Sequence, residues 1–213
     1  LTQKQARELD LVAMEEYNIQ GIQLMASAGL AIANLAVKKT GDIHEPIIVI
    51  LCGKGNNGGD GFAAALELDK KGFEVCVFCI SIFEEITGDA KYFLELCING
   101  NVQIEFSGDL LDESYRCDLI IDALLGTGVH GPVKESIIPW IKWINEKNCI
   151  VLSIDIPTGL QADSGIAEPV GVRANYTVTM GYTKLGLTMR QGPFLAGEIH
   201  VADIGFPDEA INN

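Results

Sequence analysis

The chain has 213 residues, of which 48% are hydrophobic and 21% are charged, which is enough for one α/β domain with a sizeable core and short for two. No apolar run reaches the length of a membrane span and no signal-peptide pattern opens the chain, so we expect no membrane partner. The formal net charge of −14 argues against a nucleic-acid partner, because contacts to phosphates dominate that kind of binding. A small phosphorylated ligand is not excluded, but local backbone amides would have to hold its phosphates.

Taken in chain order, the first 40 residues look helical, and their expected buried residues are Leu9, Val12, Ala13, Leu24, Met25 and Ala28. Seven apolar strands are expected after them, at 46–52, 73–81, 102–106, 118–123, 149–154, 175–180 and 197–202. Two intervening helices are expected to bury one face each, formed by Ala90, Phe93, Leu94, Cys97 and Ile98 in the first and by Ile137, Trp140, Ile141 and Ile144 in the second. Near-continuous apolar strands joined by helices predict a parallel sheet that is covered on both sides.

No repeat, low-complexity tract or linker divides the sequence, so we expect a single domain over residues 1–213. The chain opens with Leu1 rather than Met, and we expect that it was excised from a longer protein. Cys76 and Cys79 form a C-x-x-C pattern inside an apolar strand, which favours core thiols in a reducing compartment over a redox pair. We therefore expect a cytoplasmic protein, or a mitochondrial one if a targeting segment was removed.

The most informative segment is the glycine-rich run Gly53–Gly61, which lies between an apolar strand and a helical pattern. Backbone amides at such a turn, at the positive end of a helix dipole, form a site for an anionic group. Asn56, Asn57 and Asp60 are not needed by an ordinary phosphate loop, which favours chemistry on the ligand. A nicotinamide-dependent dehydrogenase is less well supported, because the next strand does not end in the acidic residue that holds a ribose hydroxyl.

Two further strands end in polar sequence, and parallel strands bring such ends to one edge of the sheet. Asp122 ends the fourth strand, and with Asn57 and Thr158 it supplies carboxylate, amide and hydroxyl oxygens. Those ligand types suit a weakly bound monovalent cation and do not suit zinc. Asp155 ends the next strand and is a candidate general acid or base, or else only the residue that shapes its turn. Lys184 is expected to reach the same edge and to hold a phosphate or pair with Asp155.

Five segments, in order and spanning nearly the whole chain, resemble the YjeF N-terminal domain family, which contains NAD(P)H-hydrate epimerase. They are GNNGGDG (55–61), DALLGTG (122–128), SIDIPTG (153–159), KLGL (184–187) and ADIGFP (202–207). The resemblance implies a Rossmann-like three-layer α/β/α sandwich with a mostly parallel central sheet and an N-terminal helical segment. It also implies epimerisation of the S and R forms of NADHX and NADPHX, in which water has added to the nicotinamide ring, as metabolite repair.

The resemblance implies a potassium ion held by Asn57, Asp122 and Thr158, and a homodimer. It implies substrate contacts from Asn56, Asn57, Gly58, Gly59, Asp60, Gly126, Thr127, Gly128, Val129, His130, Gly131, Pro132 and Asp155. We assign Asp155 and Lys184 as catalytic. The nitrogen lone pair of the hydrated ring can expel the hydroxyl and leave a planar cationic carbon, to which water can add from either face. This reaction requires proton transfer and a negative charge beside the cationic carbon.

Two positions depart from the family pattern, since Thr158 stands where serine is usual and Ala26 where glutamate is common. Threonine keeps the hydroxyl, so the cation site is expected to survive. The alternative to an enzyme is a YjeF-type binding or scaffold domain without activity, but this chain retains Asn57, Asp60, Asp122 and Asp155. The chain could also be the epimerase half of a bifunctional protein with a fused dehydratase, or act with a separate one.

Overall fold

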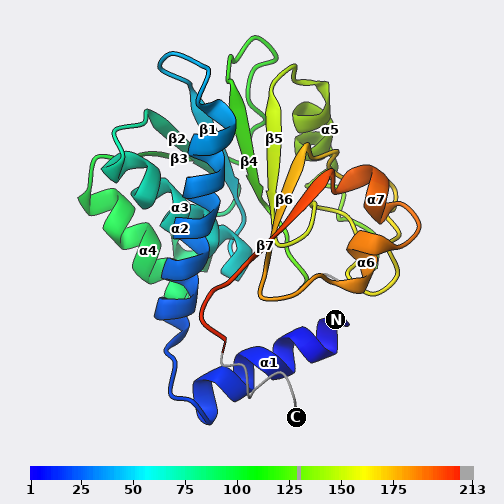
Figure 1. Cartoon of the computed structure of the whole chain (residues 1–213). Coiled ribbons are helices and arrows are strands. Elements are labelled where there is room, and N and C mark those ends of the chain that lie inside the picture. The colour runs from blue at the N-terminus through cyan, green and yellow to red at the C-terminus, as the bar shows by residue number, and fades with distance from the viewer. Residues whose placement is uncertain (129–130, 207–213) are drawn as a thin grey trace.

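Seven parallel strands form the centre of the molecule and bring their carboxyl ends to one edge (Figure 1). The computed structural model describes residues 1–128 and 131–206, and the strand order is β3-β2-β1-β4-β5-β6-β7. The strands are β1 (Ile48–Cys52), β2 (Val75–Cys79), β3 (Gln103–Phe106), β4 (Leu119–Ala123), β5 (Ile150–Ile154), β6 (Tyr176–Met180) and β7 (Glu198–Ala202). All seven predicted strands are confirmed. The inner strands β1, β2 and β4 are buried on both faces and read as unbroken apolar runs, whereas the edge strands β3 and β7 are largely exposed.

Helices cover both faces of the sheet and give the predicted three layers (Figure 1). They are α1 (Gln3–Glu15), α2 (Gly21–Thr40), α3 (Asn56–Lys70), α4 (Gly88–Asn99), α5 (Ile138–Glu146), α6 (Leu185–Thr188) and α7 (Gly192–Leu195), with the 3₁₀ turn η1 (Phe83–Glu85). One core lies between the sheet and α2, α3 and α4, and a second lies between the sheet and α5. The alternation of β1 shows this directly, since Ile50 faces the first core and Leu51 the second.

Most of the predicted core residues are buried, with two exceptions. In α4, the side chain of Ile98 is 49% exposed, so its assignment to the buried face is wrong. Ile98 follows Cys97 directly, about 100° further round the helix, which takes it past the edge of the packed stripe. Val12 of α1 is half-buried rather than buried. The predicted face of the second helix is correct throughout, from Ile137 to Ile144.

Helix α2 corrects another expectation. Within the described ranges, it is long and apolar enough to cross a membrane by length and composition alone, with a mean hydropathy of 1.3. The statement that no apolar run reaches that length was therefore wrong for this segment. Its buried residues, which include Ile32, Ala33 and Ala36, pack in the first core together with α3.

The C-x-x-C cysteines are core residues, as predicted. Cys76 and Cys79 are both buried in β2, and they face opposite sides of the sheet, toward different cores. A strand points odd and even residues to opposite faces, so a spacing of three separates these thiols. They therefore form no redox pair.

Helix α1 belongs to neither layer and runs below the carboxyl edge of the sheet (Figure 1). Its start is fixed to loops far along the chain. The backbone nitrogen of Leu1 donates to the Thr183 carbonyl at 2.6 Å, and the Gln3 backbone N–H donates to Asp163 Oδ1 at 2.6 Å. The Gln3 side-chain amide donates to the carbonyl of Thr127. These contacts place one face of α1 against the edge where the polar strand ends were predicted to meet.

Candidate active site at the carboxyl edge of the sheet

The glycine-rich turn joins β1 to α3 and is pinned to the neighbouring strand. The Gly53 N–H donates to the Ala123 carbonyl at the end of β4, at 3.0 Å. Helix α3 then begins at Asn56, with Gly55 as its N-cap. The first N–H groups of a helix have no acceptor within it, so the amides of residues 56–58 are available to an anion. The predicted anion site therefore has the required backbone.

Gly58 holds this turn closed, and we expect Gly58→Ala to open it. A Cβ at Gly58 would overlap the Gly53 carbonyl oxygen, which is backbone and cannot turn aside. We expect the variant to lose at least about tenfold in affinity for a nicotinamide dinucleotide, because its amides no longer point together. Gly55→Ala is the matched control, since a Cβ there meets nothing within 4 Å. Calorimetric titration would compare them, and equal affinities would contradict this role for Gly58.

Asn57 is the most unusual polar residue of the turn. Its side chain lies at a position only 9% exposed, and neither its Oδ1 nor its Nδ2 has a hydrogen-bond partner among the described residues. A buried amide without partners costs free energy, so such a group in a native fold points to a ligand. The amide lies against Gly126 in the loop after β4, where a Cβ would come within 2.9 Å of Oδ1.

Asp122 and Thr158 meet on the other side of that loop. Asp122 is fully buried, and its Oδ1 accepts from Thr158 Oγ1 at 2.6 Å while its Oδ2 accepts from Ser153 Oγ at 2.8 Å. Thr158 Oγ1 in turn accepts from the Leu125 N–H at 3.0 Å. Burial raises the pKa of Asp122, and the hydrogen bonds from Thr158 and Ser153 partly oppose that rise. The structure thus brings two of the three predicted cation ligands into direct contact.

Asp155 and Lys184 form a buried ion pair at the ends of β5 and β6. Lys184 Nζ lies 2.5 Å from Asp155 Oδ1, and the side chains are 5% and 14% exposed. Asp155 has a φ of 64°, a left-handed conformation that costs free energy in a residue other than glycine. Strain of this kind concentrates at functional sites, which favours a functional role for Asp155 over turn-shaping alone.

Lys184 is held on all sides. Besides Asp155, its Nζ donates to Thr179 Oγ1 at 3.1 Å and to the Met180 carbonyl at 2.9 Å. Two of the three N–H donors of the ammonium group are therefore used in hydrogen bonds, and its charge is paired with the Asp155 carboxylate. The geometry therefore favours a positioning role for Lys184, which holds Asp155 in place, over direct proton transfer to a substrate.

Two further carboxyls lie close enough to this pair to respond to its charge. Asp60, in the first turns of α3, has a pKa raised well above its usual range, chiefly by burial and then by the charges of Asp155 and Asp10. Asp10 of α1 has a pKa raised to about 6, chiefly by loss of water, while the Lys184 charge opposes the rise. The sequence offered no signal for Asp10, because only the apolar face of that segment could be interpreted.

The loop after β4 carries the remaining predicted contacts. Gly126 and Thr127 are half-buried, and Gly128, Gly131 and Pro132 are exposed. Val129 and His130, which were predicted to contact substrate, lie outside the described residues. Asn56 is exposed at the start of α3, whereas Gly58 and Gly59 are buried in it. On the far side of the glycine turn, Glu85 forms an exposed ion pair with Lys54 at 3.6 Å, a contact that the sequence did not reveal.

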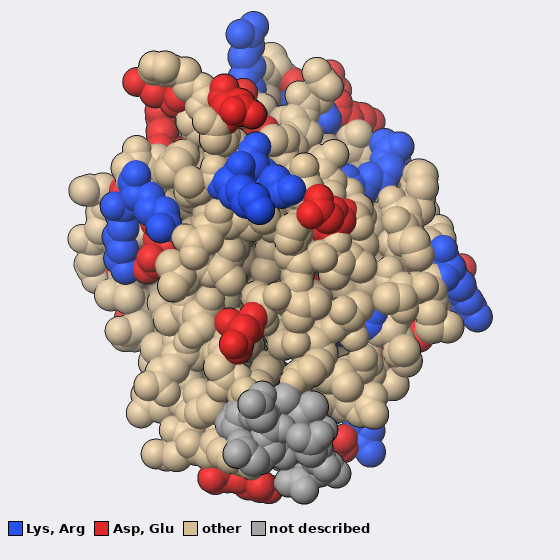
Figure 2. Space-filling view, viewed as in Figure 1, with Lys and Arg blue, Asp and Glu red and all other residues tan. Residues whose placement is uncertain are grey.

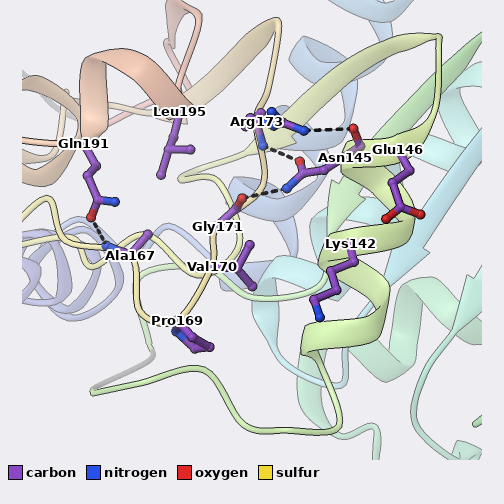
Figure 3. A pocket seen from close by; sticks show the side chains of 10 residues that line it. All are labelled: Lys142, Asn145, Glu146, Ala167, Pro169, Val170, Gly171, Arg173, Gln191 and Leu195. Atoms are coloured by element: carbon purple, nitrogen blue, oxygen red, sulfur yellow. Dashed lines mark hydrogen bonds between the residues drawn. The ribbon is translucent and has the colours of Figure 1, made fainter.

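Two hollows lie away from this edge. One, of about 390 Å³, lies between α5 and the segment before β6 (Figure 3). Part of its polar lining is paired internally, since Asn145 donates to the Gly171 carbonyl and accepts from the Arg173 N–H. The other, of about 540 Å³, includes Ile47 and Asp118, at the amino ends of β1 and β4. Neither contains a predicted site residue, so the candidate site is the carboxyl edge.

The surface charges and the possible metal ligands also bear on what the site can bind. On the face shown in Figure 2, outside the grey atoms, basic side chains are scattered and most have acidic neighbours. Across the described ranges, no three His, Cys, Asp or Glu side chains group as metal ligands. The oxygens of Asn57, Asp122 and Thr158 are instead of the kinds that a hard monovalent cation accepts.

The parallel sheet, the glycine-rich turn into α3 and the polar carboxyl edge define a Rossmann-like α/β domain with a candidate active site. A family model described as YjeF-related protein N-terminus matches residues 21–186, and the chain belongs to that family. A yeast protein, YNL200c, shares the fold, with a TM-score of 0.83, 22% identity and coverage of 100% of this chain and 91% of that one.

Curated relatives fall into two lengths. The NAD(P)H-hydrate epimerase of Rhodopirellula baltica is 33% identical over 99% of this chain and 86% of its own length, and that of Limosilactobacillus fermentum is 32% identical over 95% of each. The bifunctional NAD(P)H-hydrate repair enzyme Nnr of Salinibacter ruber is 36% identical over 97% of this chain. The chain spans 41% of that longer relative.

Proposed function

We propose that this chain is an NAD(P)H-hydrate epimerase, an isomerase that interconverts the S and R forms of NADHX and NADPHX in metabolite repair. The relatives that it covers almost end to end are named for that activity. The observation that carries the proposal is the buried Asp155–Lys184 ion pair, which a strained backbone holds at the carboxyl edge beside the free amides of α3.

The reaction needs a carbon that can lose and regain water. The ring nitrogen lone pair expels the hydroxyl from the hydrated carbon, which leaves a planar cation, and water adds to either face. Asp155 supplies negative charge beside that cation. Because Lys184 pairs with Oδ1 of the Asp155 carboxylate, Oδ2 is the oxygen that can interact with substrate. The amides of residues 56–58 hold the pyrophosphate.

A potassium ion fits the oxygens of Asn57, Asp122 and Thr158. The support comes from the orphaned, buried Asn57 amide, which lacks a partner among the described residues and lies against the same loop that Thr158 contacts. When bound, such an ion would supply positive charge that fixes the loop after β4 and helps to hold the anionic part of the dinucleotide. We also propose a homodimer that works beside a dehydratase, fused or separate. The longer relatives named bifunctional fit the fused arrangement.

The test is an epimerisation assay with pure S-NADHX, in buffers containing potassium or only a large organic cation. We expect conversion to the R form well above the spontaneous rate, and faster with potassium. Chromatography separates the two forms, and added NAD with candidate alcohols checks for dehydrogenase activity. A folded sample that binds the dinucleotide but does not convert it would instead assign the chain to the inactive binding domains.

A further inference from the structure

The proposed reaction requires two proton transfers, and the ion pair accounts for one. Asp155 can take a proton on Oδ2, but Lys184 is only 4% exposed, donates to Thr179 and Met180 and pairs with Asp155, so its ammonium group is not presented to a substrate. A second group must protonate the departing hydroxyl. Its carboxyl or imidazole must be open to solvent, lie within electrostatic range of Asp155 and keep a proton near neutral pH.

Helix α1 brings such a group to the edge. The Gln3 side chain donates to the carbonyl of Thr127, in the loop after β4, so this face of the helix points at the site. Asp10 lies seven residues further on, close to two turns, and therefore projects from the same face. Leu9 and Ala13 of that half of the helix are buried, whereas Asp10 as a whole is exposed, although surrounding atoms partly shield its carboxyl from water. A substrate can reach it.

The charges around Asp10 come from three other elements. Asp155 at the end of β5 and Lys184 before α6 both act on the Asp10 carboxyl, and Asp10 and Asp155 both act on Asp60 of α3. These groups therefore lie within range of one another's charge at the carboxyl edge. Asp163, a carboxylate from a later loop at the start of α1, accepts the Gln3 backbone N–H at 2.6 Å. The pKa values of Asp10 and Asp60 are both raised, by burial and by the charges of the neighbouring carboxylates, which favours a proton on this pair.

We propose that Asp10 is the second proton-transfer residue of the site and works with Asp155, an inference that rests on the proposed epimerase function. The Asp10 carboxylic acid gives its proton to the hydroxyl of the hydrated carbon, the C–O bond breaks, and water leaves as the ring nitrogen forms the C=N bond. Water then adds to the other face of the ring and gives its proton to Asp155. The proton returns from Asp155 to Asp10 through solvent, which leaves atoms and charge unchanged.

The test is Asp10→Asn, assayed from pH 5 to 9 with the spontaneous rate subtracted. Because the Asp10 pKa is about 6 and the acid form is the active one, the wild-type rate is expected to fall as pH rises above about 6. In the variant, kcat should drop about 100-fold, KM should stay nearly unchanged, and the fall in rate above about pH 6 should disappear. Glu8→Gln is the matched control, since that α1 carboxylate is 55% exposed and pairs with Lys4 at 3.4 Å.

Three results separate the possible failures. Wild-type rate and an unchanged pH profile in Asp10→Asn would overturn the role of Asp10 while leaving the epimerase function in place. An inactive wild-type protein would overturn the function itself. A lowered melting temperature in Asp10→Asn would count against the proposal, because removing a carboxylate with a raised pKa should leave the folded state at least as stable above that pKa.

Discussion

Asp155→Asn is expected to remove at least about 99% of the epimerase rate and to leave the protein folded. The variant keeps the shape of the side chain but loses the negative charge and the proton acceptor. Asparagine tolerates the left-handed conformation at φ 64° better than most residues, so the turn should survive. Rates with S-NADHX and a circular dichroism spectrum check both expectations.

Stability gives a second expectation for the same pair. Asp155→Asn leaves the Lys184 ammonium buried without its counter-charge, and such a loss costs up to about 3–5 kcal/mol. The double variant Asp155→Asn with Lys184→Met removes both charges and should regain much of the melting temperature but none of the activity. Asp112→Asn, at an exposed carboxylate bonded to Ser114, is the control and should change neither. Near-wild-type turnover by Asp155→Asn would exclude Asp155 from the chemistry.

Thr158→Val should weaken both the fold and the response to potassium. Valine fills the same volume but removes the hydroxyl that donates to Asp122 Oδ1 at 2.6 Å and accepts from the Leu125 N–H at 3.0 Å. Leaving those buried groups unpaired costs about 1–3 kcal/mol, or roughly 2–12 °C in melting temperature for a chain of this size. Differential scanning fluorimetry measures this change.

Thr158→Ser separates the two effects of that substitution. Serine keeps the hydroxyl, so we expect a potassium response like that of the wild type and only a small loss of stability from the missing methyl group. For Thr158→Val, the potassium concentration that gives half of the maximal rate should rise at least about tenfold, because one oxygen ligand is gone. An unchanged potassium response in Thr158→Val would remove Thr158 from the proposed cation site.

The strands and the position of the site were predictable because both follow from local patterns. The inner strands β1, β2 and β4 are buried on both faces, so their apolar runs are continuous and easy to recognise, whereas the edge strands β3 and β7 are largely exposed. Once the strands are parallel, their carboxyl ends must share an edge, and Asp122 and Asp155 were placed there correctly. The glycine turn carried its own signal, since Gly58 is needed where backbone meets backbone.

What the sequence could not supply depends on contacts between distant segments. Asp10 reaches the site only because Leu1 and Gln3 bond to Thr183, Asp163 and Thr127, more than 120 positions away. The burial of Lys184 likewise depends on how the loop after β6 folds back on Thr179 and Met180. The prediction that Ile98 is buried was wrong for a simpler reason. Helical periodicity shows which side of a helix is apolar but does not show how far around the helix the buried face extends.

The most direct test of the central claim is epimerisation of S-NADHX in water enriched in oxygen-18, followed by mass spectrometry of the R form at low conversion. The proposed function and its route predict R product formed faster than in the absence of protein, with one labelled oxygen in each molecule, because the hydroxyl leaves and water returns. R product that formed rapidly without label would contradict the loss and return of water. No acceleration, from a folded protein in potassium buffer, would contradict the epimerase function itself.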